Sequence, residues 1–237
     1  MKKKILLLHG WNWRNYTKLT KSTDAWNNRE KFVKELQSYY DVYKINFPGF
    51  CGEPEPNSKE WNLNDYAKFV KDYLDKNELE VDYILGYSFG GAVAINYNYL
   101  YNKNQKLILI SPAIIRNSDA SKRMIKTPAF MQKLRNAIRD LYLKIIIKNP
   151  YMINGTKFLN NTYQRIVRVE LLDLIKDIDP MMINIIYGSI DDQVNPSYVC
   201  SNVSKQLRER IIVIDGGGHD IANTHTDEVI NIIRNIK

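Results

Sequence analysis

The sequence predicts an α/β fold with a mostly parallel sheet of about six strands, flanked by helices on both faces. Short apolar runs, rich in β-branched residues and closed by Gly, Pro or Ser, alternate along the chain with longer stretches of helical spacing. The composition, 44% hydrophobic and 25% charged over 237 residues, is that of an ordinary globular chain, which excludes disorder, collagen and coiled coil. A chain of this length forms one large domain or two small ones.

Six apolar runs are expected to be the strands, and their lack of polar alternation predicts that both faces of each strand are buried. In chain order they cover residues 5–8, 42–47, 81–87, 107–110, 183–187 and 211–214.

Five segments between these runs carry apolar residues at helical spacing. Strand–helix alternation implies right-handed crossovers between parallel strands. Either Asn62 or Asn64 is expected to cap the second helix at its N-terminus. In chain order the helical segments cover residues 26–36, 63–74, 91–101, 198–207 and 226–236.

One interval interrupts the alternation, because residues 114–180 contain no clear strand signal. An amphipathic pattern over residues 130–147 predicts a long helix, and residues 160–178 predict another. We therefore expect residues 1–113 and 181–237 to form the core. Residues 114–180 are expected to form a helical insertion between the fourth and fifth strands.

The net charge of +8 is concentrated in this insertion. It holds 13 Lys and Arg against 6 Asp and Glu, which leaves 21 against 20 for the rest of the chain. We interpret this charge first as a solvated, lysine-rich helical surface. The alternative is that it attracts an anionic substrate or an acidic surface. No nucleic-acid-binding motif accompanies it, so no nucleic-acid partner is expected.

The cysteine content and the N-terminus predict a cytoplasmic protein. Cys51 and Cys200 are too few for a disulfide framework and fit a reducing compartment. The apolar run at residues 5–8 is too short for a signal peptide. No stretch approaches the roughly 18 apolar residues that a span needs, so no integral membrane segment is expected.

A candidate nucleophile, Ser88, lies in the G-x-S-x-G pattern of residues 86–90. The pattern follows an apolar strand and opens a predicted helix. A sharp turn there would expose the serine hydroxyl, and glycines remove the side chains that would block the turn. The N-terminus of the helix would direct N–H groups and a positive dipole at an oxyanion. The alternative is a glycine turn without chemistry.

His219 is the candidate general base among the three histidines of the chain. It follows the sixth strand in the Gly-rich loop of residues 215–220, from which an imidazole can extend over the end of the sheet. His9 directly follows the first strand and better suits a structural role. His225 is expected at the surface.

The carboxylate that orients the base is expected just past the fifth strand, where Asp191 and Asp192 are adjacent. We choose Asp191, because Val194 three residues later matches the usual spacing of such an acid loop. Asp192 is the alternative. Either residue could instead serve only the turn, which Asp favours.

The chain order of these groups, Ser88, Asp191 and then His219, is that of α/β hydrolases and differs from the other two serine-triad orders. Two further segments resemble that superfamily: residues 9–11 its HG oxyanion loop, and residues 45–52 its PGFG segment. The sequence is therefore similar, nearly from end to end, to the α/β-hydrolase superfamily and to its serine esterase- and lipase-like branch with a helical cap.

The resemblance implies that the sheet starts at the family's third strand and that the insertion is the helical cap. The backbone N–H groups of Trp11 and Phe89 would form the oxyanion hole, and His9 would brace its loop. A serine nucleophile argues against the dehalogenase and epoxide hydrolase branches, which use a carboxylate. Two positions depart from the family pattern: Tyr87, where esterase relatives often have His, and Cys51, which we interpret as a small apolar filler.

Together these residues predict a carboxylesterase-type serine hydrolase that cleaves an ester or thioester of a small-molecule acyl substrate through an acyl-enzyme. No metal-ligand spacing and no nucleotide-binding glycine pattern occurs, so no metal or cofactor is expected. The alternative is a non-catalytic small-molecule-binding or signalling protein on the same fold. Eight apolar residues of the insertion are candidates to line the acyl site, although most are expected to pack it onto the core: Met124, Phe130, Met131, Tyr142, Tyr151, Met152, Phe158 and Tyr163.

Overall fold

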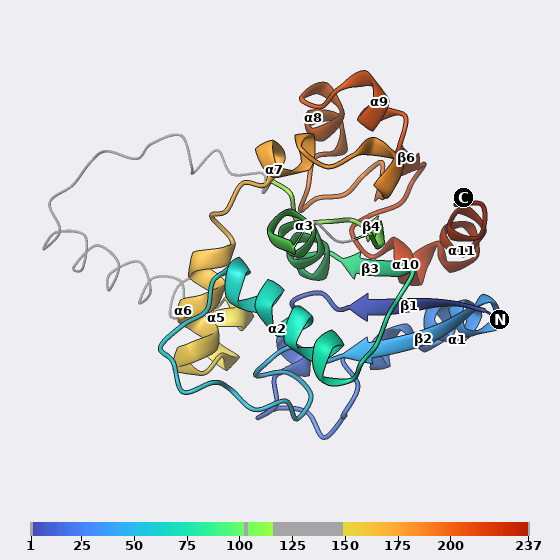
Figure 1. Ribbon diagram of the computed structural model, residues 1–237. Coiled ribbons are helices and arrows are strands. Elements are labelled where there is room, and N and C mark those ends of the chain that lie inside the picture. The colour runs from blue at the N-terminus through green and yellow to red at the C-terminus, as the bar shows by residue number, and fades with distance from the viewer. Residues whose placement is uncertain (1, 102–103, 116–148, 237) are drawn as a thin grey trace, which may run out of the picture.

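The computed structural model describes residues 2–101, 104–115 and 149–236 and is built on one sheet of six parallel strands (Figure 1). The strands lie in the order β2-β1-β3-β4-β5-β6, and every neighbouring pair is parallel. The predicted fold class is confirmed, and the strand bounds differ from the predicted runs by no more than two residues at either end. The bounds are β1 Lys3–Leu8, β2 Tyr40–Ile45, β3 Tyr83–Tyr87, β4 Lys106–Ile110, β5 Ile183–Gly188 and β6 Ile211–Ile214.

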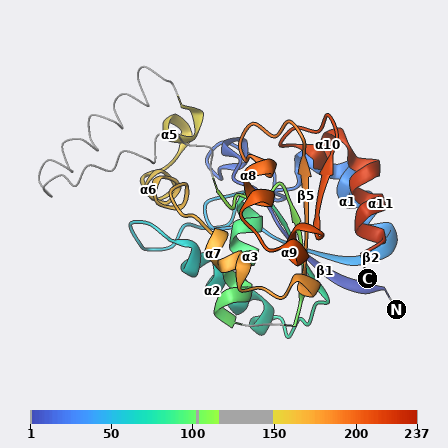
Figure 2. The same ribbon diagram turned by 90° about the horizontal axis from the view of Figure 1, so that it is seen from above.

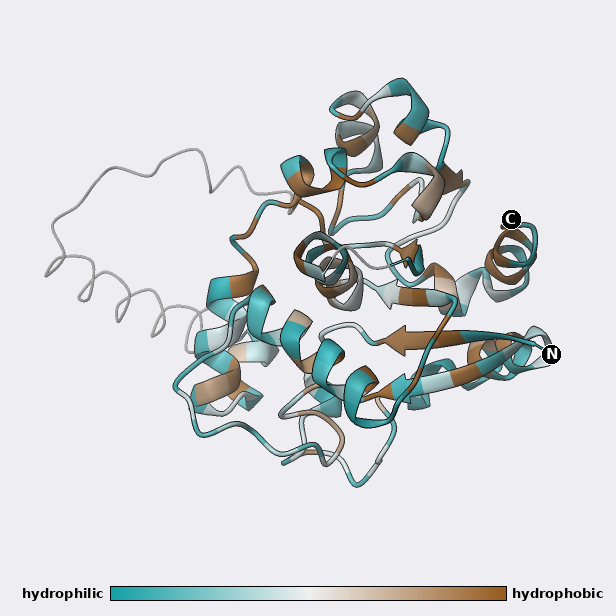
Figure 3. Cartoon of the chain, viewed as in Figure 1, coloured by the Kyte–Doolittle hydropathy of each residue, from teal (hydrophilic) through white to brown (hydrophobic). Residues whose placement is uncertain are grey.

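Helices cover both faces of the sheet (Figure 2). Alternate residues of a strand point to opposite faces, so Ile5 and Leu7 of β1 belong to one core cluster and Leu6 and Leu8 to the other. Figure 3 shows β1 as hydrophobic and much of α2 as hydrophilic. The helices of the first face are α1 Glu30–Tyr39, α10 Ile221–Thr224 and α11 Thr226–Arg234, and those against the centre of the second face are α2 Leu63–Lys76 and α3 Phe89–Tyr101.

The prediction that every strand is buried on both faces is wrong for β6. Ile212 and Val213 of this strand are 39% and 44% exposed. The reason is topological: β6 is the last strand of the sheet, so it has a neighbour on one side only. The three residues in the middle of β2, the other edge strand, are also only partly buried.

The predicted helices are present, with differences at their ends. Asn62 caps α2, and its side chain and that of Asp65 form a reciprocal capping box. The predicted helix over 198–207 is two short helices instead, α8 Pro196–Ser201 and α9 Lys205–Arg208. It is interrupted because Ser204 begins a new helix, its hydroxyl accepting a hydrogen bond from the N–H of Leu207.

Residues 149–182 contain further helices, and the first two, α5 and α6, lie beyond the carboxyl ends of β1 and β3, where the arrows of Figure 1 point. The helix expected over 130–147 lies outside the described residues. No helix in the described ranges is long and apolar enough to cross a membrane. The elements here are α5 Pro150–Asn154, α6 Lys157–Ile166, α7 Leu172–Lys176 and a 3-10 turn, η3 Pro180–Met182.

Candidate active site

The turn between β3 and α3 holds Ser88 in a strained conformation. Its φ of 51° lies in the left-handed region that non-glycine residues rarely adopt. The turn is possible because two glycines leave room for it. A Cβ on Gly86 would lie 2.5 Å from the carbonyl oxygen of Gly90, and a Cβ on Gly90 would lie 2.0 Å from that of Leu8. The G-x-S-x-G pattern therefore forms a sharp turn that places Ser88 at the carboxyl end of β3.

Three predicted groups come together there in one hydrogen-bonded chain. The Oγ of Ser88 lies 2.9 Å from Nε2 of His219. Nδ1 of the same imidazole lies 2.9 Å from Oδ2 and 3.0 Å from Oδ1 of Asp191. The carboxylate can only accept, so Nδ1 carries the proton and Nε2 is free to accept the serine proton.

Asp191 is held by its own loop. Its Oδ1 accepts hydrogen bonds from the N–H groups of Gln193 and Val194, at 2.9 and 3.0 Å. Burial alone would raise the pKa of this carboxyl. The hydrogen bond and charge interaction with His219, together with the two N–H donors, outweigh burial and lower the pKa below its ordinary value. Asp191 is therefore an ionised acceptor at neutral pH. Asp192 is exposed, and in the described part of the chain His219 makes no hydrogen bond to it.

Two backbone N–H groups beside Ser88 are without a partner. Within residues 2–101, 104–115 and 149–236, neither the N–H of Trp11 nor that of Phe89 donates a hydrogen bond. Both residues are buried and line the same cavity as Ser88. Phe89 is also the first residue of α3, where the helix dipole places positive charge. Both N–H groups can thus donate hydrogen bonds to a negatively charged oxygen.

The Trp11 side chain is fixed by Tyr16, a residue that no pattern in the sequence indicates. Its indole Nε1 donates to the hydroxyl of Tyr16 at 2.7 Å, and its ring packs edge-on against Phe50 and Phe89. Tyr16 is fully buried and lies in a loop without helical or strand periodicity. An isolated antiparallel bridge to Phe50 and the hydrogen bond to Trp11 place it beside the site.

His9 has a structural position next to this loop. Its Nδ1 donates to the carbonyl oxygen of Gly10, and its Nε2 accepts from the N–H of Phe47, both at 2.9 Å. These bonds fix one neutral tautomer and join the loop after β1 to the loop after β2. Burial lowers the pKa of His9 to about 4, so the ring is uncharged at neutral pH.

We expect this buried histidine to make folding stability fall in mild acid. The unfolded chain takes up the proton near pH 6.5 and the folded chain only near pH 4, so the unfolded state binds more protons between them. Wild type should lose about 2 kcal/mol more between pH 6.5 and 4.5 than His9→Gln, measured by denaturant unfolding. The partly exposed His225 provides a control, and His225→Gln should follow wild type. Equal pH slopes for wild type and His9→Gln would contradict the prediction.

The cavity beside Ser88 is small, about 40 Å³. Two of the eight candidate acyl-site residues, Tyr151 and Tyr163, line it, and their rings stack with centroids 5.0 Å apart. Met152 and Phe158 are buried in the core cluster and do not line it. The other four candidates lie outside the described residues. The cavity is lined by Trp11, Leu63, Ser88, Phe89, Ala92, Ala113, Tyr151, Tyr163, Ile166, Val167, Val169 and Gln193.

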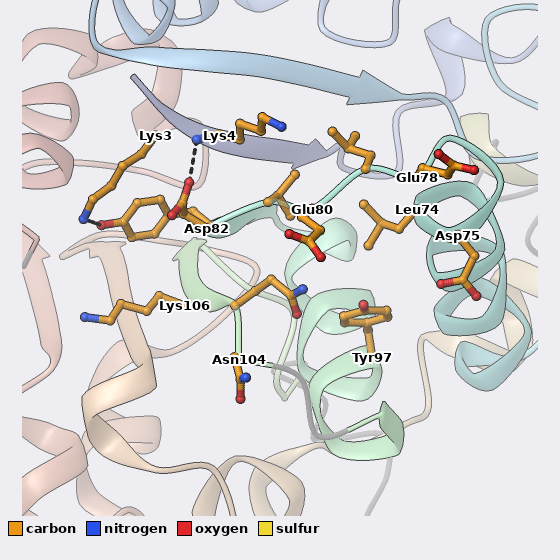
Figure 4. Close-up of a pocket in the computed structure, with 14 residues that line it drawn as sticks. Lys3, Lys4, Leu74, Asp75, Glu78, Glu80, Asp82, Tyr97, Asn104 and Lys106 are labelled. Atoms are coloured by element: carbon orange, nitrogen blue, oxygen red, sulfur yellow. Dashed lines mark hydrogen bonds between the residues drawn. The ribbon is translucent and has the colours of Figure 1, made fainter. Parts of the chain in front are cut away.

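A much larger hollow of about 940 Å³ lies at the opposite, amino ends of β1, β3 and β4 (Figure 4). Charged side chains of both signs line it, among them Lys3, Lys4, Glu80 and Asp82. None of the three hydrogen-bonded groups described above reaches it. Ligands of parallel α/β sheets bind outside the carboxyl ends of the strands, so the smaller cavity beside Ser88 is the candidate substrate site.

The remaining candidates have positions away from the hydrogen-bonded groups. Cys51 is buried, and burial raises the pKa of its thiol to about 11, which fits a filler rather than a reactive group. His225 lies between α10 and α11 and is partly exposed. Among the described residues no cluster of His, Cys, Asp or Glu could hold a metal ion.

Comparison with known proteins places these features in a wider group. The model of a family described as the alpha/beta hydrolase family matches residues 5–232. A Mycoplasma genitalium protein named "Putative esterase/lipase 2" is 24% identical over 224 residues, which cover 84% of this chain and 80% of that protein. The pimeloyl-(acyl-carrier protein) methyl ester esterase of Pseudoalteromonas atlantica is 27% identical over 118 residues, 48% of this chain and 40% of the esterase.

Several curated relatives match over only part of their length, and the chain spans between 26% and 44% of three of them. Among solved structures, a carboxylesterase of Bacillus subtilis superposes with a TM-score of 0.67 at 15% identity, covering 99% of this chain and 83% of that one. At this identity the likeness shows the fold.

Proposed function

The chain belongs to the alpha/beta hydrolase family, and we propose that it is a carboxylesterase-type serine hydrolase. The observation that carries the proposal is the hydrogen-bonded chain from Ser88 through His219 to Asp191 at the turn before α3. Its esterase- and lipase-like relatives support the class of reaction.

The proposed reaction begins with attack of the Ser88 Oγ on the acyl carbonyl carbon. Nε2 of His219 takes the serine proton as the new C–O bond forms, and Asp191 stabilises the resulting imidazolium. The N–H groups of Trp11 and Phe89 donate to the oxyanion of the tetrahedral intermediate. Neither N–H has a partner among the described residues, which supports this role, because a bound oxyanion then displaces none of the hydrogen bonds described.

The acyl-enzyme forms when the bond to the leaving group breaks. His219 gives its Nε2 proton to the departing oxygen of an ester or sulfur of a thioester. A water molecule then attacks the acyl carbonyl while His219 takes one of its protons. Return of that proton to the Ser88 Oγ releases the carboxylic acid and restores the starting state.

We further propose that residues 114–180 form a cap over this site. Their described part is tied to the loop after β2. The N–H of Trp61 donates to Oγ1 of Thr162 at 2.9 Å, and Arg165 pairs with Glu60. Tyr163 and Ile166 of the same helix, α6, line the cavity beside Ser88. This attachment supports a role of α6 as one wall of the acyl site.

The size of the cavity predicts a preference for short acyl groups. One water molecule needs about 10–15 Å³ of such space, so 40 Å³ holds roughly three waters or a short acyl chain. We expect kcat/KM for p-nitrophenyl esters to be highest between acetate and butyrate and to fall roughly 10-fold or more by octanoate. An increase in kcat/KM up to octanoate would contradict this prediction.

A matched pair of variants tests whether α6 forms one wall of the cavity beside Ser88. Ile166→Ala removes methyl groups from the cavity and should shift the optimum toward longer esters. Ile153→Ala changes α5 at a side chain that is 49% exposed and does not line the cavity, so its profile should match wild type. A folded wild type without ester or thioester turnover, and without reaction toward a fluorophosphonate probe, would instead favour a non-catalytic binding protein.

A further inference from the structure

The loop that carries His219 is rich in glycine, and its backbone is hydrogen-bonded on the side of β5, from Gly216 N–H to Ser189 Oγ and from Ile190 N–H to the Gly217 carbonyl, both at 2.9 Å. Residues 215–220 join β6 to α10 and include Gly216, whose φ is +68°. Hydrogen bonding to Asp191 fixes the imidazole from the side of β5. It does not fix the backbone of the loop on the opposite side, where α1 and α10 meet.

A buried arginine lies on that side. Arg29 is 8% exposed and precedes α1, but its side chain does not cap this helix. Its Nε and Nη2 donate to the same oxygen, Oδ1 of Asp220, at 3.0 and 2.6 Å. Nη1 donates to Asn28 at 2.9 Å. A buried guanidinium is stable only where its charge and donors are matched, so these partners define its position.

The same guanidinium lies over the ring of Tyr87, with Cζ 4.0 Å from the ring centroid. Tyr87 directly precedes Ser88, and Asp220 directly follows His219. The Tyr87 hydroxyl lies 3.4 Å from both Oδ1 of Asp220 and the carbonyl oxygen of His219. One cation therefore contacts the chain neighbour of the proposed nucleophile and the chain neighbour of the proposed base.

We propose that Arg29 is a positioning residue that sets the distance between Ser88 Oγ and His219 Nε2. It acts through Tyr87 and Asp220 and does not touch the reacting atoms. The inference rests on the proposed function for its effect on catalysis. Its effect on the His219 ring is independent of that function. No pattern in the sequence marks this residue, which lies 191 positions from Asp220.

The test compares Arg29→Met with Lys31→Met. Lys31 also forms an ion pair between α1 and the C-terminal helices, with Asp227 at 2.7 Å, but both side chains are largely exposed and neither residue is a chain neighbour of Ser88 or His219. We expect Arg29→Met to lower kcat for p-nitrophenyl acetate about 10- to 100-fold with KM changed less than about threefold. Lys31→Met should resemble wild type.

Arg29→Lys provides the conservative variant. It keeps the charge but loses the guanidinium over the Tyr87 ring and the paired donation to Asp220, so its kcat should lie between those of wild type and Arg29→Met. If Arg29→Met does not fold, the double variant Arg29→Met with Asp220→Asn removes both charges of the pair. We expect the same decrease in kcat for this double variant as for Arg29→Met. A folded variant whose kcat equals that of Lys31→Met would overturn the proposal.

A second readout does not depend on turnover. The chain has three histidines, so the imidazole NMR signals of isotope-labelled protein can be assigned. Arg29→Met should change the His219 signals and leave those of His9 in place. Unchanged His219 signals would overturn the positioning role. An inactive wild type whose His219 signals do respond would refute the proposed esterase function alone.

Discussion

Replacement of Ser88 by alanine is expected to lower kcat for ester hydrolysis by about 10⁴- to 10⁶-fold. The Ser88 hydroxyl lies 2.9 Å from Nε2 of His219 and is the nucleophile of the proposed reaction. Without it no acyl-enzyme can form, and only binding and the oxyanion donors act on the substrate. Folding should be retained, because the turn is made by Gly86 and Gly90 and not by the serine side chain.

A second serine supplies the control. Ser111 also has a left-handed φ, 43°, and is fully buried, and its hydroxyl has no partner among the described residues. Ser111→Ala thus removes a buried hydroxyl from a strained position outside the hydrogen-bonded chain, and should keep kcat within about threefold of wild type.

Steady-state hydrolysis of p-nitrophenyl acetate and covalent labelling by a fluorophosphonate give two readouts for these variants. Wild type and Ser111→Ala should both react with the probe, and Ser88→Ala should not. Labelling that persists in Ser88→Ala would exclude Ser88 as the nucleophile. Loss of labelling in Ser111→Ala but not in Ser88→Ala would identify Ser111 as the nucleophile and would refute the proposed role of Ser88.

The features that the sequence predicts well are local. The G-x-S-x-G turn, the strand runs and the Asn62 cap depend on residues a few positions apart, so spacing alone indicates them. The hydrogen bond between Asp191 and the N–H of Val194, three residues on, belongs to the same class. Chain order then indicates which distant segments carry compatible chemistry, although it contains no distances.

The features that the sequence misses depend on tertiary neighbours. The exposure of β6 follows from its place at the edge of the sheet, which an apolar run of four residues does not reveal. Tyr16 lies outside every predicted element, and Arg29 lies in the predicted helical segment 26–36 but not at one of its apolar positions; each forms its hydrogen bond with a residue of another element. The helical pattern at 198–207 was broken by a local cap at Ser204, which competes successfully with continued helix.

Asp191→Asn is expected to lower kcat by about 10⁴-fold, whereas Asp192→Asn should stay within about twofold of wild type. The N–H groups of Gln193 and Val194 bind Oδ1 of Asp191, so the amide oxygen of an asparagine would occupy that position. Its NH₂ group would then replace Oδ2, which lies 2.9 Å from Nδ1 of His219. A donor at that place forces the ring proton onto Nε2, where the imidazole can no longer accept the proton of Ser88.

The comparison of the two carboxylates is informative because they are adjacent and the substitutions are identical. Asp192 is exposed, so its replacement removes the same charge one residue away without changing the tautomer of His219. Parallel p-nitrophenyl acetate assays with circular dichroism as the folding check separate the two. Loss of turnover in Asp192→Asn alone would assign the acid to Asp192.

A double variant tests whether the three groups act as one unit. Suppose that Asp191 contributes only by preparing His219 to take the proton of Ser88. Replacing Asp191 should then lower kcat no further once Ser88 is alanine. Ser88→Ala and Ser88→Ala with Asp191→Asn should therefore have the same residual kcat, although the separate effects would multiply to about 10⁸-fold or more if they were independent. A further loss in the double variant would show that Asp191 stabilises the reaction by a route that does not pass through the serine proton.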